Sequence, residues 1–147
     1  MANNSLLRKL KRCRIIKNGD YMAVKTNAVR LVEQAGIPCR ESFYEFDEKD
    51  LNGNHAAAAI GMPPEQVFKT LVLHGDRTGH IVCVVPGDCE VDLKALAKAS
   101  GNKKVEMIAM KDLLAVTGYI RGGCSPLGMK KRFPTYFHST AILFDHI

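Results

Sequence analysis

The chain has 147 residues, of which 46% are hydrophobic and 24% are charged, a composition typical of one globular domain with a core of its own. No apolar run approaches the roughly 20 residues that cross a bilayer, and the basic N-terminus lacks the features of a secretory signal, so we expect a cytoplasmic protein without a membrane partner. Five cysteines without a C-x-x-C pair and five scattered histidines argue against disulfides and metal sites, so neither a metal nor another cofactor is expected.

The net charge of +6 is concentrated at the start of the chain. Residues 1–22 contain six basic side chains and one acidic side chain, Asp20, so they carry five of the six net charges. We expect a basic, poorly ordered extension over 1–22, with a short amphipathic helix as the alternative, followed by one domain over 23–147. Charges nearly balance within that domain, but four basic residues near its end form a patch without an acid: Arg121, Lys130, Lys131 and Arg132.

Three segments have the apolar spacing of amphipathic helices, at 26–36, 91–101 and 109–118. Thr26 and Asp92 are suited to be N-caps of the first two helices, and each of the three segments ends in a glycine. A shorter, alanine-rich helix is predicted just before the Pro63-Pro64 pair, which cannot continue it.

Strands are expected between these helices. Residues 67–85 contain two apolar, β-branched runs around a glycine-bounded turn, which predicts a hairpin. Single strands are expected at 41–46 and 103–108, and one or two strands at 135–147. The order of elements favours an α/β chain of the α+β type, with a mixed, largely antiparallel, barrel-like sheet and peripheral helices.

Lys69 lies inside the first apolar run of the hairpin. With a period of two, Lys69, Leu71 and Leu73 share one face of the strand, and Thr70 lies on the other. One interpretation is a lysine whose stem packs on apolar surface while its ammonium reaches water. The alternative is an ammonium that points into a pocket and binds an anionic or carbonyl oxygen.

The stretch YIRGGCSPLGMKKR, residues 119–132, combines three glycines with basic residues. Adjacent glycines allow a close approach of backbone N–H donors to a ligand, although a tight turn with glycines at positive φ explains the pattern as well. Cys124 invites a role as nucleophile, but no histidine is fixed near it by the sequence, and a small buried thiol is the more common case. Tyr44 and Tyr119 are either half-buried strand residues or hydroxyl donors beside a pocket.

Together these segments resemble the YbaK/EbsC family. The resemblance rests on four stretches in the family's order and spacing: TNAVRLVEQAGIPCRESFYEFD, PEQVFKTLVL, LKALAKASGNKKVEM and VTGYIRGGCSPLGMKKRFPT. It covers residues 24–147. Members of the family are free-standing aminoacyl-tRNA editing deacylases, similar to the editing domain of bacterial prolyl-tRNA synthetases. The chain looks most similar to the branch that removes cysteine from tRNA specific for proline.

The resemblance implies roles for five residues. Lys69 would anchor the terminal adenosine or the ester of the substrate, with Thr70 beside it. Tyr44 and Tyr119 would line the pocket, and Gly122 would offer its backbone N–H to the reacting carbonyl oxygen. No protein nucleophile is implied, because the thiol of the substrate's own cysteine attacks its ester carbonyl, and tRNA leaves as the cysteine cyclises to a thiolactone. Such a site works by positioning and by stabilising an oxyanion.

The chain departs from the family pattern in two ways. Relatives continue beyond the position of Ile147 with segments that contribute serine and aspartate side chains, so we expect a domain that lacks its usual C-terminal segment. The region of Asn52-Gly53 lacks a phenylalanine often found in the cysteine branch, which leaves the substrate open. The alternatives are Ala-tRNA(Pro) or another small mischarged aminoacyl-tRNA, and a non-catalytic tRNA-binding relative. The resemblance also suggests prolyl-tRNA synthetase as a partner.

Overall fold

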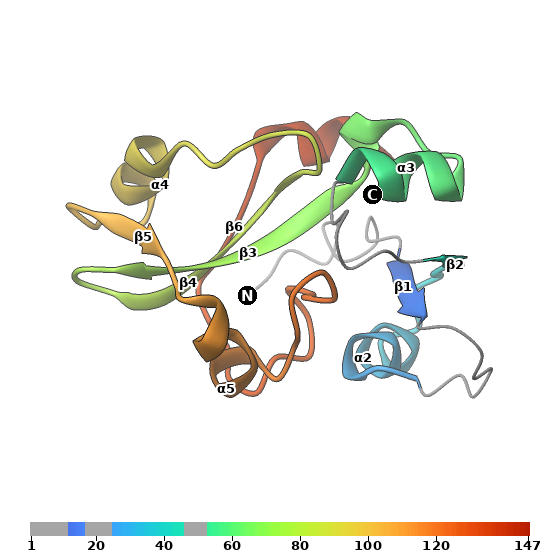
Figure 1. Cartoon of the computed structure of the whole chain (residues 1–147), viewed down its shortest axis with the longest axis horizontal. Coiled ribbons are helices and arrows are strands. Elements are labelled where there is room, and N and C mark those ends of the chain that lie inside the picture. Colours follow the sequence, from blue (N-terminus) through green and yellow to red (C-terminus); the bar gives the residue numbers. More distant parts are fainter. Residues whose placement is uncertain (1–11, 17–24, 46–52) are drawn as a thin grey trace.

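The computed structural model describes residues 12–16, 25–45 and 53–147, and Figure 1 shows their arrangement. The strands of this described part are β1 (Arg12–Ile16), β2 (Glu41–Glu45), β3 (Phe68–Gly75), β4 (Gly79–Pro86), β5 (Val105–Met107) and β6 (Thr135–Phe137). Its α-helices are α2 (Asn27–Gln34), α3 (Gly53–Ile60), α4 (Leu93–Ala99) and α5 (Leu113–Thr117), and short 3-10 helices span Pro64–Gln66, Met110–Asp112 and Ser139–Leu143. No helix within these ranges is long and apolar enough to span a membrane.

The main sheet has four strands in the order β5-β3-β4-β6. Strand β3 pairs antiparallel with β4 and with β5, whereas β4 and β6 run parallel. A second, two-stranded sheet joins β1 and β2 in parallel. The predicted mixed fold with a mostly antiparallel sheet and surrounding helices is confirmed, and the main sheet is open rather than closed into a barrel.

Two segments differ from their predicted form. Of the one or two strands predicted over 135–147 one is present, the three-residue β6, and a 3-10 helix follows it where the rest of the strand was expected. The His138 ring accepts a hydrogen bond from the Thr140 N–H at the start of that helix. Residues 12–16 of the basic extension form β1, which neither the helix nor the poorly ordered alternative anticipated. The rest of the extension lies outside the described residues.

Of the two predicted N-caps, Asp92 makes capping hydrogen bonds and Thr26 does not. The Asp92 carboxylate accepts hydrogen bonds from the N–H groups of Lys94 and Ala95, each 2.9 Å long, at the start of α4. Thr26 occupies the N-cap position of α2, but its side chain makes no capping hydrogen bond. Glycine at positive φ ends α5, where Gly118 has a φ of 82°.

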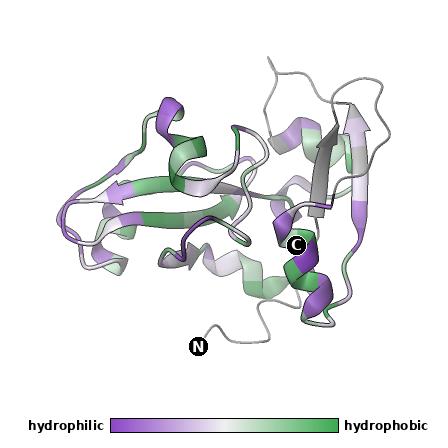
Figure 2. Ribbon diagram, turned by 90° about the horizontal axis from the view of Figure 1, so that it is seen from below, coloured by the Kyte–Doolittle hydropathy of each residue, from purple (hydrophilic) through white to green (hydrophobic). Residues whose placement is uncertain are grey.

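Strands β3 and β4 consist mostly of hydrophobic residues, as Figure 2 shows. They carry an apolar layer on each of their faces, as the alternation of the sequence predicts. One layer contains Leu73 and Ile81 with Leu96 of α4, and the first two of these are fully buried. The other layer contains Val72 and Val82 with α5 and the segment that follows it. Full burial of one such aliphatic side chain contributes roughly 1.5–3 kcal/mol, so this hairpin is the main source of stability.

The tip of the hairpin is held by the segment between α4 and β5. The Asn102 side chain accepts hydrogen bonds from the N–H groups of Arg77 and Thr78, at 2.9 and 3.0 Å, and donates to Ser100 Oγ at 2.8 Å. The Asp76 carboxylate accepts from the N–H groups of Lys103 and Lys104, at 2.9 and 3.1 Å. These bonds fix the turn to the edge of the sheet over a long separation in sequence.

We predict that Gly75→Ala destabilises the protein by about 2–4 kcal/mol, because a buried side chain fixed by hydrogen bonds blocks the new methyl group. A Cβ at position 75 would lie 2.3–2.5 Å from the side-chain atoms of Asn102. Urea unfolding followed by circular dichroism measures the loss. In the double variant with Asn102→Ala the obstacle is gone, so the double variant should be little less stable than Asn102→Ala alone. Strictly additive losses would contradict the proposed collision.

We also predict that Asp76 makes stability depend on acid pH. Hydrogen bonds from the backbone of Lys104 and Lys103 lower the pKa of the Asp76 carboxyl below its ordinary value of 3.8. A lowered folded-state pKa stabilises the protein above the ordinary value, and that contribution is lost as the pH falls through the folded-state pKa. The difference in unfolding free energy between the wild type and Asp76→Asn should therefore shrink toward acid pH. A difference that is the same at neutral and acid pH would argue against this role.

Candidate functional site

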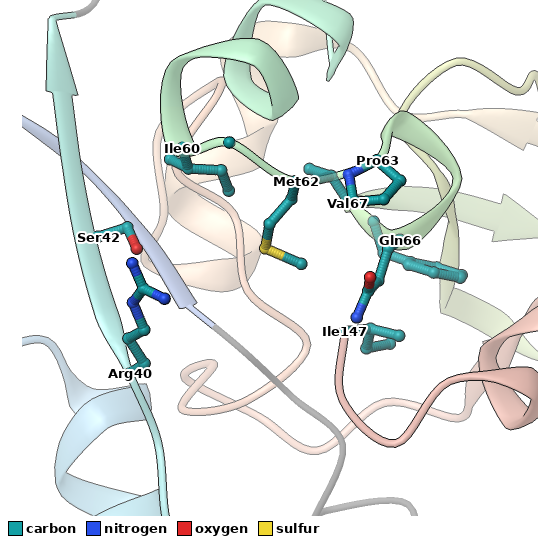
Figure 3. Close-up of a pocket in the computed structure, with 10 residues that line it drawn as sticks. Arg40, Ser42, Ile60, Met62, Pro63, Gln66, Val67 and Ile147 are labelled. Atoms are coloured by element: carbon teal, nitrogen blue, oxygen red, sulfur yellow. The ribbon is translucent and has the colours of Figure 1, made fainter.

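A pocket of about 290 Å³ lies between β2, the end of α3 and the start of β3 (Figure 3). Its lining residues are Arg40, Ser42, Ile60, Gly61, Met62, Pro63, Gln66, Val67, Phe68 and Ile147. Arg40 and Ser42 lie on one side of the pocket, and the side chain of Met62 extends toward its centre. The volume is at the small end of the range for ligand pockets, which begins at about 300 Å³.

Three of the lining residues have polar side chains, Arg40, Ser42 and Gln66, and the others are apolar or glycine. The Gln66 amide donates a hydrogen bond to the His146 carbonyl at 2.6 Å, which fixes the wall that Ile147 forms. Arg40 is exposed and is the one charged side chain among the lining residues. The pocket can therefore accept a small, partly apolar group that has an oxygen-rich end.

Lys69 is half-buried on β3, one residue beyond the pocket-lining Phe68. Its ammonium donates a hydrogen bond to the Gly87 carbonyl at 3.1 Å. The Gly87 N–H in turn donates to the Val67 carbonyl at 2.6 Å, so the end of β4 is held in place beside the lysine. The ammonium also lies close enough to Cys89 to lower the pKa of that thiol, although burial and Asp88 raise this pKa overall.

Thr70 faces the opposite side of β3 from Lys69. Leu71, on the lysine's face, packs in the layer that includes α4, whereas Phe68, on the threonine's face, packs in the layer that includes α5. The alternation predicted for this strand is confirmed. The two residues are thus neighbours in sequence whose side chains extend from different faces of one sheet.

The stretch 119–132 forms a loop that closes on itself at the end of α5. The Lys130 N–H donates to the Thr117 carbonyl at 3.0 Å, and within the loop the Tyr119 hydroxyl donates to the Leu127 carbonyl at 2.6 Å. Gly128 packs against the start of α2, where a Cβ would lie 2.8 Å from the Asn27 side chain. The loop therefore lies between α5 and α2, as Figure 1 shows, and its shape is fixed at several points.

Gly122 occupies a tight turn near the start of this loop. The Gly123 N–H donates to the Ile120 carbonyl at 3.1 Å, and Gly122 has a φ of 78°, which suits the third position of a type II turn. The tight-turn interpretation of the glycine pair is therefore confirmed. Gly122 is exposed, and among the described residues its N–H has no hydrogen-bond acceptor, so this donor is available to a ligand.

Cys124 is placed unfavourably for nucleophilic attack. Its side chain packs in the apolar layer on the α5 side of the sheet. Burial raises the pKa of the Cys124 thiol to about 11, with a smaller opposing effect from the Thr117 hydroxyl. A thiol with that pKa is almost entirely protonated at neutral pH, whereas the thiolate is the nucleophile.

We predict that Cys124 is alkylated slowly in the folded protein, because near pH 8 only about one such thiol in a thousand is ionised at a pKa of about 11. Mass spectrometry after iodoacetamide treatment measures the labelling, with the urea-unfolded chain as the reference. Labelling at the same rate in both states would show that burial does not protect the thiol. Deacylation, where measured, should survive Cys124→Ala.

Tyr44 lies on β2, on the same face as the pocket-lining Ser42 by strand alternation. Its ring meets the ring of His55 on α3 edge to face, with 6.4 Å between the centroids. Tyr44 is thus at the pocket's end of the molecule, whereas Tyr119 is bonded into the loop after α5.

The pocket residues Arg40, Met62 and Gln66 were missed by the sequence analysis. Met62 and Gln66 lie in one stretch of the chain, 60–68, but Arg40 directly precedes β2, and no spacing in the sequence brings it to the other two. The one usable signal was the Pro63-Pro64 pair, which marks where α3 has ended and the lining segment begins. Among the residues that the structure describes, no group of three or more histidine, cysteine, aspartate or glutamate side chains could hold a metal ion.

Residues 53–147 match the family profile of the aminoacyl-tRNA editing domain. A protein from Enterococcus faecalis, provisionally named Cys-tRNA(Pro)/Cys-tRNA(Cys) deacylase EbsC, is 56% identical over 123 residues, which cover 84% of this chain and 75% of that protein. Proline–tRNA ligase 1 from Streptomyces avermitilis is 30% identical over 121 residues, which cover 81% of this chain and 20% of the ligase.

Solved structures show the same fold. One is described as a provisional trans-editing enzyme for prolyl-tRNA synthetase, with a TM-score of 0.60, 23% identity, and coverage of 67% of this chain and 62% of that one. Another, described only as a hypothetical protein, has a TM-score of 0.63 at 20% identity and covers 76% of this chain and 72% of its own. The chain therefore belongs to the aminoacyl-tRNA editing domain family, and the predicted class of enzyme, an aminoacyl-tRNA deacylase of the YbaK/EbsC kind, is confirmed.

Proposed function

We propose that this protein removes cysteine from mischarged Cys-tRNA(Pro). The observation that supports this substrate is the 56% identity to a relative whose provisional name specifies Cys-tRNA(Pro) and Cys-tRNA(Cys). The small volume of the pocket favours a small acyl group. Because the substrate is a tRNA of the translation machinery, the protein would act in the cytoplasm.

The proposed reaction uses the substrate's own thiol. The thiol sulfur attacks the ester carbonyl carbon, a C–S bond forms, and the ester C–O bond breaks as the thiol proton passes to the leaving ribose oxygen. The products are tRNA and a cysteine thiolactone, and no oxidant or cofactor is consumed. A free cysteine thiol has a pKa of about 8.5, so it is far more readily ionised than Cys124, whose pKa is about 11.

Gly122 and Lys69 would stabilise and position the reacting ester. The exposed Gly122 N–H, without an acceptor among the described residues, is suited to an oxyanion. Lys69 already donates to a carbonyl oxygen, that of Gly87, and the half-buried ammonium can bind an ester or ribose oxygen in the same way. Tyr44, beside the pocket, and Thr70 and Tyr119, on the loop's side of the sheet, remain the proposed substrate-binding residues.

Prolyl-tRNA synthetase is proposed as a partner that supplies or retains the tRNA. The support is the 30% identity to a proline–tRNA ligase, whose sequence contains a segment of this kind. A non-catalytic tRNA-binding protein is the second possibility, and it predicts retention of tRNA without loss of the aminoacyl group.

We predict that Lys69→Ala lowers the rate of cysteine release from Cys-tRNA(Pro) at least about 100-fold, because loss of one oxyanion or positioning donor typically has an effect of this size. Release of radiolabelled cysteine over time measures the rate. Lys98→Ala, which removes an exposed lysine from α4, is the matched control and should react at the wild-type rate.

Circular dichroism must show that both variants are folded, because Lys69 also binds the Gly87 carbonyl. A wild-type rate for folded Lys69→Ala would refute the proposed site. Parallel assays with Ala-tRNA(Pro) decide the acyl group: faster removal of alanine than of cysteine would assign the protein to the alternative substrate.

A further inference from the structure

We propose that the end of the loop after α5 is a phosphate-binding surface that holds the acceptor arm of tRNA, with Lys131 and Arg132 as its principal contacts. The inference rests on the proposed function for the identity of the nucleic acid. It adds to that function the surface that binds the RNA outside the pocket.

The basic residues of this surface are not neutralised. Arg121, Lys131 and Arg132 are exposed, and within the described residues none of them has a hydrogen-bond or ion-pair partner. Lys130 donates one long hydrogen bond, of 3.4 Å, to the Ala115 carbonyl and has no ion-pair partner among the described residues. Two other exposed cations are paired, Lys25 with Glu33 and Lys104 with Glu106. The exposed Lys94 and Lys98 on α4 have no ion-pair partner among the described residues, but no further lysine or arginine joins them in a run like 130–132. Unpaired cations in a cluster attract a polyanion by releasing its counterions.

The backbone that carries these cations is held in place. The Lys130 N–H is bonded to Thr117, which is fully buried. On the other side of the run, the Phe133 ring meets the His80 ring edge to face at 5.9 Å, and the Phe133 carbonyl accepts from the Thr135 hydroxyl at 3.0 Å. The charges therefore sit on a fixed segment between two anchors, so less ordering entropy opposes binding than for a free tail.

The surface is connected to the proposed site by the same loop. Gly122 lies in the turn near the start of the loop, and the hydrogen bond that closes the loop involves Lys130, the first residue of the basic run. Phosphates held at positions 131 and 132 would thus fix the position of the acceptor arm relative to Gly122. Such contacts do not discriminate between bases, and they set position and affinity.

A nucleic acid fits this surface better than a membrane does. Met129 and Phe133, which flank the basic run, are both packed into the apolar layer on the sheet. They are therefore not free to insert between lipids, as the apolar residues of a membrane-binding segment do. A folded RNA requires only the phosphate contacts.

The test compares two double charge reversals that change the net charge equally. Lys131→Glu with Arg132→Glu alters the proposed surface, whereas Lys94→Glu with Lys98→Glu alters exposed lysines on α4, on the other face of the sheet. Binding of deacylated tRNA, which carries no amino acid, is measured by fluorescence anisotropy over a range of salt concentrations. At about 0.1 M salt we expect the first variant to bind tRNA at least about tenfold more weakly than the wild type. The slope of log K against log salt concentration should become shallower by about two, and the control variant should show far smaller changes in both quantities.

Equal losses of tRNA affinity in both variants, or no loss in either, would overturn the proposal. Binding to anionic phosphatidylserine vesicles is measured in parallel, and a larger effect of Lys131→Glu with Arg132→Glu on vesicle binding than on tRNA binding would also overturn it. Deacylation gives a second readout. The loss in kcat/KM on Cys-tRNA(Pro) should exceed the loss on 3′-cysteinyl-adenosine, which has no phosphate, and equal losses on both substrates would also overturn it. If the wild type releases no cysteine from either substrate, the proposed function fails, and the binding comparison still decides on the surface.

Discussion

The pairing of β3 with β4 is the constraint on which the other parts of this molecule depend. Eight residue pairs, from Phe68↔Pro86 to Gly75↔Gly79, set which side chains reach each face of the sheet. One face then receives α4, and the other receives α5 and the loop after it. A slip of one residue would move the side chains of one strand to the opposite face, so the side chains in both apolar layers would lose their packing partners. The hydrogen bonds of Asn102 and Asp76 at the hairpin tip oppose such a slip, because they bind the turn in one register.

That register also separates the proposed site residues. Lys69 lies on the face of α4, whereas Thr70 and the loop with Gly122 lie on the face of α5. A substrate that contacts both Lys69 and Gly122 must therefore pass the end of the sheet and cannot lie on one face alone. The pocket is situated at that end, and it is lined by Val67 and Phe68, two consecutive residues at the start of β3. The location of the pocket thus suits a ligand that reaches both faces.

Local patterns in the sequence predicted the hairpin, the Asp92 cap and the alternation around Lys69, because each depends on neighbours in the chain. The failures involve contacts between distant segments. Strand β1 exists through parallel pairing with β2, and no periodicity within 12–16 could indicate this partner. The pocket is assembled from several segments in the same way. The roles of the site residues came from the resemblance to a family, since a site without a nucleophile or metal has no catalytic motif of its own.

The distribution of charge suits a protein that binds tRNA with one surface and selects its substrate at another. A neutral domain with a few unpaired cations binds RNA weakly except where those cations cluster, because each phosphate contact contributes about one counterion's release. The cluster at Lys131 and Arg132 lies on a loop whose closing bonds involve buried or packed groups, Thr117 and Phe133. Weak but positioned binding suits an editing enzyme, which must release correctly charged tRNA as readily as it meets the mischarged form. Discrimination is then left to the chemistry at the ester, where only a substrate with its own well-placed thiol can cyclise.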